Sequence, residues 1–221
     1  MRAILKHIVA RTYKPLLEKY LSKTRTYQYE DIRLDVAPEV FHPGFFFSTH
    51  MLLKYLKKLP LEKKLFLELG CGSGLISIYA AKKGAMVTAT DINETALLFL
   101  AKNSRFNNTA LRIIKSDLFH DISEQAFDII AINPPYYKKQ PQSFEDYAWF
   151  CGENGEYFEQ LFAGLKNYMH SETMVLMVLC DGCDIEMVER LARENGCSMQ
   201  AIYTKKNMLE TNFIYRIQLR K

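Results

Sequence analysis

A glycine-rich turn between an apolar run and a helical pattern constrains the fold of this chain more than any other feature. Residues 65–69 are mostly apolar, Gly70, Gly72 and Gly74 then follow at alternate positions, and the apolar spacing of a helix resumes at Leu75. Glycine accepts a positive φ and leaves no Cβ where a backbone must approach a ligand closely. The pattern predicts a strand, a tight turn and a helix, with a small molecule bound against the turn.

The spacing of these glycines separates several classes of ligand-binding turn. The dinucleotide fingerprint Gly-x-Gly-x-x-Gly requires a third glycine where Leu75 stands, and the chain has no Gly-Lys-Ser or Gly-Lys-Thr to form a phosphate-binding loop. A nicotinamide-dependent oxidoreductase is therefore a poor alternative. The spacing Gly-x-Gly-x-Gly, with Glu68 two residues before the first glycine, resembles the first motif of class I S-adenosylmethionine-dependent methyltransferases.

The apolar patterns along the rest of the chain predict an α/β fold. Strands are expected at 65–69, 86–90, 111–115, 127–132, 174–179, 197–203 and 212–219, and helices from Ser48 or Thr49 to before Pro60 and at 75–83, 93–106, 155–168 and 185–194. The alternation predicts a doubly wound, mostly parallel, seven-stranded Rossmann-like sheet with an antiparallel C-terminal edge. We expect residues 46–221 to form this domain. Residues 1–45 should form an extension, with two short helices in 3–22 and an edge strand or hairpin arm in 27–36.

Polar residues stand at the ends of three further predicted strands, where ligands of such sheets bind. Asp91, followed by Ile92, lies about 20 residues beyond the first glycine, where a carboxylate accepts hydrogen bonds from a ribose diol. Asp117 is suited to accept from the exocyclic amine of an adenine while Leu118 packs on the ring. The alternatives are that Asp91 caps the next helix and that Asp117 is an ordinary turn residue.

The segment Asn133-Pro134-Pro135-Tyr136 suits methylation of a planar nitrogen. Such a nitrogen is a poor nucleophile because its lone pair is delocalised into the adjoining π system. The side-chain carbonyl of Asn133 and the backbone carbonyl of Pro134 offer two acceptors that hold the NH2 group with its lone pair facing a methyl donor, within about 3–3.5 Å. Tyr136 offers a flat face for stacking. The alternative is a rigid strand-to-loop turn.

These features together resemble the class I methyltransferases with an Asn-Pro-Pro-Tyr motif, from about residue 36 to residue 165. That family includes release-factor glutamine methyltransferases and enzymes that methylate base amines of RNA or DNA. The resemblance implies S-adenosylmethionine as cofactor and catalysis by Asn133, Pro134 and Tyr136. It implies a cofactor site of Glu68, Gly70, Cys71, Gly72, Gly74, Asp91, Ile92, Asp117, Leu118 and Asn133, and a substrate site of Phe45, Phe46, Pro135, Tyr136 and Tyr137.

The methyl acceptor stays open at this point. Residues 148–155 resemble the aromatic, glycine-rich loop of the release-factor enzymes, which favours a protein glutamine. Seven Lys or Arg within residues 1–30, with Lys138 and Lys139 beside the motif, favour the phosphates of RNA or DNA. The same basic helix is equally consistent with a solvated face packed on the domain. From a different class, the alternative is a catalytically silent binding subunit with this fold.

Two other features need an interpretation. Three phenylalanines at 45–47 follow Pro43 and Gly44, which predicts a segment folded back over something apolar or planar; a core aromatic cluster is the alternative. Cys180 and Cys183 invite a metal or redox site, but no second closely spaced pair of ligands accompanies them. We expect them to be small apolar fillers at a strand end.

Composition excludes several other classes of protein. The chain has 221 residues, of which 48% are hydrophobic and 24% charged, as in ordinary globular domains and unlike disordered ones. Five cysteines, an odd number, do not form a secreted disulfide framework. No apolar run approaches the roughly 18 residues of a membrane span. We therefore expect a cytoplasmic enzyme without a metal or a membrane partner, with a net charge of +4.

Overall fold

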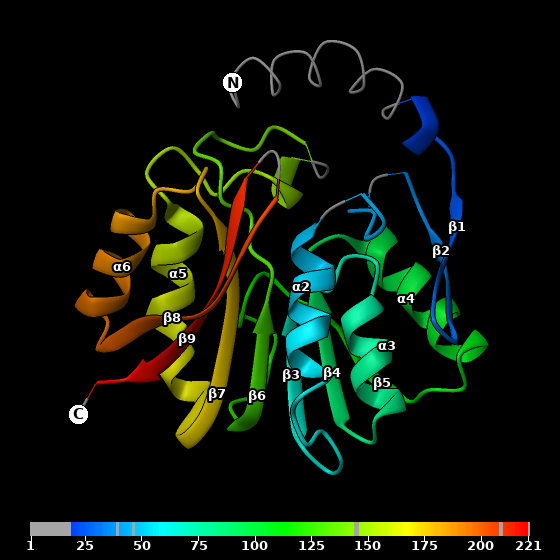
Figure 1. Cartoon of the computed structure of the whole chain (residues 1–221), viewed down its shortest axis with the longest axis horizontal. Helices are drawn as coiled ribbons and strands as arrows, with labels where there is room; N and C mark the ends of the chain where they lie inside the picture. The colour runs from blue at the N-terminus through cyan, green and yellow to red at the C-terminus, as the bar shows by residue number, and fades with distance from the viewer. Residues whose placement is uncertain (1–18, 39, 46, 144–145, 208–209, 221) are drawn as a thin grey trace.

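The computed structural model describes residues 19–38, 40–45, 47–143, 146–207 and 210–220. Its main sheet has seven strands in the order β5-β4-β3-β6-β7-β9-β8 (Figure 1). The strands are β3 (Leu65–Leu69), β4 (Met86–Asp91), β5 (Leu111–Lys115), β6 (Phe127–Ile132), β7 (Met169–Cys180), β8 (Cys197–Lys206) and β9 (Thr211–Leu219). β3 to β7 are parallel, and β9 is antiparallel to β7 and β8. The predicted fold class is confirmed, and the strand order reverses between β3 and β6.

Helices cover both faces of this sheet. One face carries α2 (Phe47–Leu56), α3 (Leu75–Lys82) and α4 (Glu94–Phe106), the other α5 (Glu156–Leu165) and α6 (Ile185–Glu194), with short 3-10 turns η1 (Asp146–Ala148) and η2 (Lys166–Tyr168). Alternate residues of a strand enter opposite layers of the core: Phe66 packs with the first group of helices and Leu67 with the second. Both side chains have no exposed surface.

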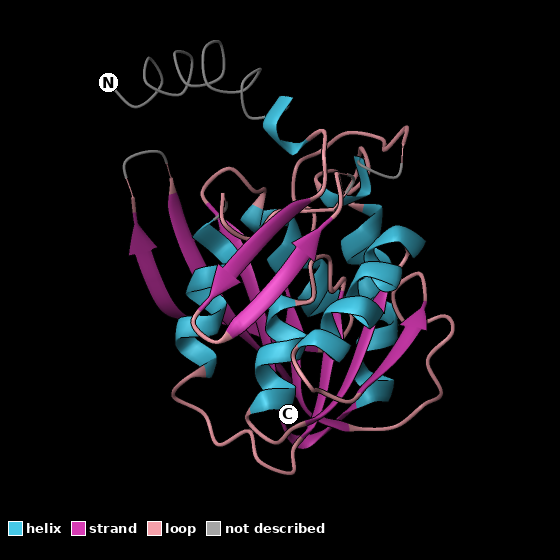
Figure 2. Ribbon diagram, turned by 90° about the vertical axis from the view of Figure 1, so that its right-hand side faces the viewer, coloured by secondary structure: helices cyan, strands magenta, loops and turns pink. Residues whose placement is uncertain are grey.

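A separate two-stranded sheet, β1 (Arg25–Tyr29) and β2 (Ile32–Val36), lies across α3 and α4 (Figure 2). Two asparagines, one in α4 and one at its C-cap, bind the backbone of β2. Asn103 accepts from Asp35 N and donates to Asp35 O, both at 2.9 Å, and Asn107 makes the corresponding bonds to Arg33 at 3.0 and 2.7 Å. The region predicted as an edge strand or hairpin arm is therefore a hairpin. The helices predicted within residues 3–22 lie mostly outside the described residues.

The structure corrects the predicted start of α2. The helix begins at Phe47, so Ser48 and Thr49 lie within its first turn and do not cap it. Both side chains are buried, at 4% and 6% exposure, and they line the main cavity of the molecule. Phe47 extends the helix because its ring packs against the apolar core.

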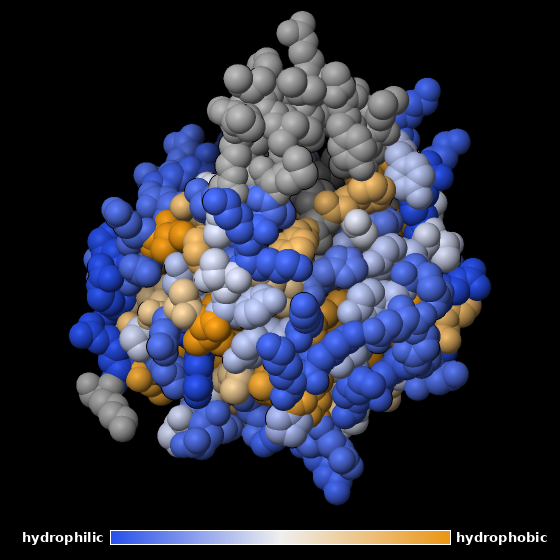
Figure 3. Space-filling model, viewed as in Figure 1, coloured by the Kyte–Doolittle hydropathy of each residue, from blue (hydrophilic) through white to orange (hydrophobic). Residues whose placement is uncertain are grey.

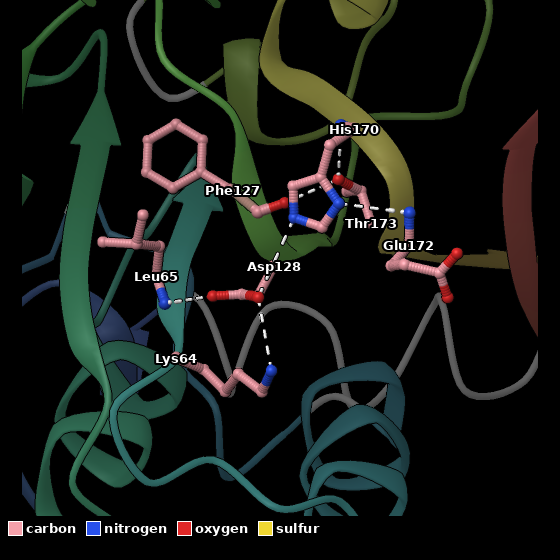
Figure 4. Close-up of polar contacts among 7 residues, drawn as sticks. All are labelled: Lys64, Leu65, Phe127, Asp128, His170, Glu172 and Thr173. Carbon is pink, nitrogen blue, oxygen red and sulfur yellow. Dashed lines mark hydrogen bonds and ion pairs between the residues drawn. The ribbon is translucent and has the colours of Figure 1, made fainter.

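Strand β7 is longer than predicted because hydrogen bonds of a side chain hold it against β6 at a β-bulge. Its pairing with β6 shifts register between Phe127 and Ile129. Thr173 Oγ1 donates to Phe127 O at 2.6 Å and accepts from His170 N at 2.8 Å (Figure 4). The exposed residues 171–172 interrupt the apolar pattern, which is why the sequence predicted a start at 174.

Asp128, near the start of β6, binds residues at the start of β3 and of β7 (Figure 4). Its Oδ2 accepts from Leu65 N at 2.8 Å, and its Oδ1 lies 3.3 Å from Lys64 Nζ and 3.8 Å from His170 Nε2. The Leu65 amide and the Lys64 ammonium stabilise the carboxylate and lower the pKa of Asp128.

Candidate active site

The main cavity opens beyond the carboxyl ends of β3, β4, β5 and β6, at the point where the strand order reverses. Ligands of open α/β sheets bind at such positions. Among the residues predicted from the sequence, those that line it are Glu68, Gly70, Cys71, Gly72, Asp91, Ile92, Asp117, Leu118, Asn133, Pro134, Pro135 and Tyr136. Segments far apart in the chain thus meet around one space.

The three glycines of the turn have different surroundings. All have positive φ, at 70° for Gly70, 48° for Gly72 and 77° for Gly74. A Cβ on Gly70 would find no atom within 4 Å, whereas a Cβ on Gly74 would lie 2.2 Å from Leu100 Cδ1. Gly70 therefore leaves open space beside the cavity, and Gly74 permits α3 to pack on α4.

Asp91 at the end of β4 anchors the turn from the other side. Its Oδ2 accepts from Gly72 N at 2.8 Å and its Oδ1 accepts from Asn93 N at 2.9 Å. Burial raises the pKa of Asp91, while these two amide bonds oppose the rise. The cap of α4 is Asn93, whose side chain accepts from Thr95 N at 2.9 Å. The alternative that Asp91 caps this helix is therefore wrong.

Glu68 is a buried acid beneath the turn, at 5% exposure. Its carboxylate accepts a hydrogen bond from Ser77 Oγ. Burial raises the pKa of Glu68 to about 8, against the lowering effect of the Ser77 bond. Near neutral pH the side chain therefore carries a proton in a large part of the molecules.

The loop after β5 brings Asp117 and Leu118 to the cavity. Leu118 has a φ of 48°, a left-handed conformation that is uncommon for a residue with a Cβ. Ser116 stabilises the loop, because its Oγ donates to Leu118 O at 2.9 Å and accepts from Asp121 N at 3.0 Å. The Asp117 side chain stays exposed at the rim of the cavity.

Asn133 follows directly on the buried end of β6 and is half-buried at the cavity. Within the described part of the chain, no hydrogen bond occupies its side-chain amide. Tyr136 is also half-buried, and its ring lies 4.9 Å from that of Tyr137 in an edge-on arrangement. Burial, followed by the neighbouring Cys180, raises the pKa of Tyr136 well above its ordinary value. Its hydroxyl is therefore protonated at physiological pH.

The segment 149–152 pairs with the chain after Tyr136 and shapes the cavity mouth. Tyr137 N donates to Trp149 O at 3.0 Å, and Cys151 N donates to Tyr137 O at 2.9 Å. Lys139 and Gly152 exchange two bonds of 3.2 Å. The Trp149 ring lies 5.3 Å from that of Phe41, and both rings line the cavity.

Three of the predicted residues are placed elsewhere, and one cannot be placed. Gly74 lies behind the turn, Phe45 packs beside His42 at 4.9 Å between ring centroids, and Tyr137 is 39% exposed, all outside the lining of the cavity. Phe46 lies outside the described residues. The lining that sequence reasoning missed includes Val40, Phe41, Ser48, Thr49, Asn93, Ser116, Tyr147, Trp149 and Tyr157.

Cys180 and Cys183 stand next to this site as free thiols. Cys180 is buried at the end of β7 and its Sγ accepts from Gly182 N at 3.3 Å. Across the described residues, no three His, Cys, Asp or Glu side chains gather in a way that suits a metal ion. None of the helices that the structure describes has the length and apolarity to cross a membrane.

Comparison with known proteins identifies the family. The model of the methyltransferase small domain matches residues 32–152, more than half of the chain. The chain belongs to the methyltransferase small-domain family. This methyltransferase is 36% identical over 146 residues to a Methanocaldococcus jannaschii protein provisionally named as a protein N5-glutamine methyltransferase, covering 63% of this chain and 72% of that protein. It is 38% identical over 99 residues to the release factor glutamine methyltransferase of Streptococcus pneumoniae, covering 43% of this chain and 35% of the relative.

Solved structures of low identity share the fold. One is the E. cuniculi Mtq2–Trm112 complex, described as methylating the eRF1 translation termination factor, with a TM-score of 0.64, 21% identity, and coverage of 82% of this chain and 99% of that one. Another is the T. thermophilus 16S rRNA N2 G1207 methyltransferase in complex with AdoMet and guanosine, with a TM-score of 0.62, 17% identity, and coverage of 90% and 50%.

The AdoMet bound in the T. thermophilus structure is S-adenosylmethionine. The cavity has features that fit such a group. Any side chain at position 70 would fill the open space beside Gly70. The cavity lining combines two acids, Asp91 and Asp117, each followed in the chain by an apolar residue, Ile92 and Leu118. The nicotinamide-dependent oxidoreductase considered from the sequence is therefore wrong.

Proposed function

We propose that this methyltransferase transfers a methyl group to the side-chain amide nitrogen of a glutamine in a protein. The observation that carries the proposal is Asn133, which reaches the cavity from the end of β6 with its amide unoccupied by any hydrogen bond among the described residues. A structural turn asparagine usually binds nearby backbone groups, as Asn93 and Asn107 do here. An asparagine without such bonds retains its hydrogen-bonding capacity for a ligand.

Asn133 and Pro134 hold the accepting nitrogen in the proposed mechanism. The Asn133 Oδ1 and the Pro134 carbonyl accept hydrogen bonds from the two N–H groups of that nitrogen. This arrangement turns its lone pair out of conjugation. Tyr136 supports the planar acceptor by stacking, with its hydroxyl kept protonated. Bound S-adenosylmethionine supplies an electrophilic methyl group on a sulfonium. No strong base is required, because the nitrogen becomes acidic once it is alkylated and its proton leaves to water.

The cofactor-binding roles follow from the same cavity. We assign the ribose diol to Asp91, whose two amide bonds leave each carboxylate oxygen a further lone pair. We assign the adenine to the loop after β5, with Asp117 accepting from the amine and Leu118 packing on the ring. Gly70 and Gly72 provide the close backbone approach.

A protein glutamine is favoured over other acceptors by the segment 149–152. Its pairing with residues 137–139 fixes an aromatic wall of Phe41 and Trp149 beside the Asn-Pro-Pro-Tyr segment. The names of the M. jannaschii and S. pneumoniae relatives describe glutamine methylation, and both relatives align with this chain at more than 30% identity.

A base amine of a nucleic acid is a second candidate acceptor. The observation that favours it is a group of lysines and aromatic rings on the outer face of α2, whose first turn also lines the cavity. Asn133 and Pro134 would hold an exocyclic amine in the same way as an amide, because both are planar NH2 groups.

The test is transfer of radiolabelled methyl from S-adenosylmethionine into a lysate of a strain that lacks this protein. Half of the product is digested with protease and half with nuclease, and the labelled fragments are identified by mass spectrometry. Label released by protease alone, on a glutamine that has gained 14 mass units, supports the proposal. Label released by nuclease alone transfers the function to the second candidate, and label on a carbon or an oxygen would contradict both.

A further inference from the structure

A second hollow of the molecule lies on the outer face of α2. We call it the lysine groove, and its lining is Tyr29, Phe47, His50, Met51, Lys54, Lys57, Tyr203 and Lys205. It is built by β1, α2 and β8. Figure 3 shows that hydrophilic side chains with apolar ones between them cover the face on which α2 lies.

The lysine groove carries an excess of positive charge. Neither α2 nor β8 contains an acidic residue, and both continue into further lysines, Lys58 and Lys206. Glu30 of the hairpin forms an ion pair with Lys57. Lys54 and Lys205 are exposed and have no ion-pair partner among the described residues. A groove of one charge sign attracts ligands of the opposite sign.

Aromatic rings alternate with these cations. Lys205 Nζ lies 4.7 Å from the centroid of the Phe47 ring, Lys57 Nζ lies 5.2 Å from that of Tyr29, and Lys58 Nζ lies 5.5 Å from that of Tyr203. All three rings are half-buried. Such exposed cation–π contacts are weak, about 0.5–1 kcal/mol each, so a bound anion can draw the ammonium groups aside and uncover the ring faces.

The lysine groove and the active site lie against different sides of the same helix, α2. Phe47 lies in the groove, while the next two residues, Ser48 and Thr49, line the main cavity. At about 1.5 Å per residue, the seven residues from Phe47 to Lys54 span about 10 Å of α2. Helix α2 therefore contributes to both hollows, which have no lining residue in common.

From this arrangement we infer that the lysine groove binds single-stranded RNA. Backbone phosphates pair with Lys54 and Lys205, and bases stack on the rings of Tyr29 and Tyr203. An acidic protein segment would use the lysines alone and leave the alternating ring faces without partners. The inference goes beyond the proposed function, because it does not depend on which nitrogen accepts the methyl group.

The test measures binding of the full chain to a ten-nucleotide oligouridylate with a fluorescein label, by anisotropy between 50 and 300 mM salt. Lys54→Glu/Lys205→Glu should weaken binding at least tenfold. The milder variant Lys54→Gln/Lys205→Gln should lower the slope of log affinity against log salt by about 1.4, since each phosphate contact to a single strand contributes about 0.7. The matched control Lys166→Glu/Arg193→Glu makes the same charge change just after α5 and in the last turn of α6, and its affinity should stay within twofold of wild type.

Three further measurements test the stacking, the choice of ligand and the independence from the cofactor site. Tyr203→Leu should weaken binding of the oligouridylate about fivefold or more, since stacking of a base on an aromatic ring is worth about 1–3 kcal/mol, with no change in salt slope. A fluorescein-labelled peptide of ten glutamates should bind at least tenfold more weakly than the RNA. Calorimetry with S-adenosylmethionine should give unchanged affinity for every groove variant, which separates this inference from the proposed function. Equal binding of peptide and RNA, or equal losses in groove and control variants, would overturn it.

Discussion

Replacing Gly74 by alanine should destabilise the fold through one contact. The backbone at Gly74 has a φ of 77°, and a Cβ there would lie 2.2 Å from Leu100 Cδ1 and 3.3 Å from its Cγ. Leu100 is fully buried, so it has no open space to enter. A left-handed conformation costs a residue with a Cβ about 1–2 kcal/mol, and overpacking a filled core costs about 1–3 kcal/mol. The free energy of unfolding should therefore fall by about 2–5 kcal/mol.

Gly70→Ala is the matched control for this prediction. Gly70 has a φ of 70°, but a Cβ would meet no atom within 4 Å. Only the conformational cost of about 1–2 kcal/mol is expected, measured for both variants by urea denaturation followed by circular dichroism. Gly70→Ala should nevertheless lose more affinity for S-adenosylmethionine, because Gly70 lines the cavity and Gly74 lies behind it. Equal losses of stability in the two variants would refute the steric argument.

A double-mutant cycle identifies the partner. Leu100→Ala alone should cost about 2–5 kcal/mol by leaving a cavity. Combined with Gly74→Ala, the loss should be smaller than the sum by about 1–3 kcal/mol, because the added methyl then has room. Strict additivity would show that Leu100 is not the obstacle.

Three other predictions concern polar side chains that bind within the fold. The pKa of Glu68 is raised to about 8 from 4.5, so the folded chain keeps a proton that the unfolded chain releases, and stability falls as pH rises from 4.5 to 8. The free energy of unfolding of Glu68→Gln, measured by urea titration at pH 5, 6.5 and 8, should therefore rise relative to that of wild type as pH increases. A difference between the two proteins that does not change with pH would contradict this. Asn107→Ala should cost about 1–3 kcal/mol, because the N–H and C=O of Arg33 lose their partner, and hydrogen exchange at the Arg33 amide should accelerate; unchanged exchange would refute the role. Asp128→Ala removes the acceptor of Leu65 N and should lower the free energy of unfolding by about 1 kcal/mol at pH 7. Because the pKa of Asp128 is lowered in the folded chain, this difference from wild type should shrink below pH 3.8. A difference that persists in acid would count against the role of the carboxylate.

The order of strands and helices was predictable because local patterns set it. The glycines at 70, 72 and 74 adopt positive φ, as their spacing indicated, and each polar residue expected at a strand end lies at the end of a strand or just after it. Where a boundary was wrong, a tertiary contact decided it. Phe47 joins α2 because its ring packs on the core, and β7 extends to Met169 because Thr173 spans the bulge.

The rest of the cavity wall depends on contacts between distant segments, which no local pattern reports. The three phenylalanines at 45–47 pointed to the right loop, but Phe41 reaches the cavity while Phe45 packs on His42. Trp149 joins the wall through backbone pairing with Tyr137. Tyr157 lies near Asp91, as the rise of the Tyr157 pKa caused by burial and by this acid indicates. The residues that neighbour Tyr157 in the sequence gave no indication that it lines the cavity.

Substitution of Asn133 tests the proposed mechanism most directly. The measurement pairs calorimetry of S-adenosylmethionine binding with single-turnover transfer to the acceptor identified in the lysate. Asn133→Ala should keep cofactor affinity within about threefold while the rate of transfer falls by about 10²–10³, the loss typical of one positioned hydrogen-bonding group in an active site. The control Asn167→Ala, at an exposed site bonded to Glu124, should match wild type in both. A transfer rate within a few-fold of wild type for Asn133→Ala would contradict the assignment of Asn133 as the group that holds the accepting nitrogen.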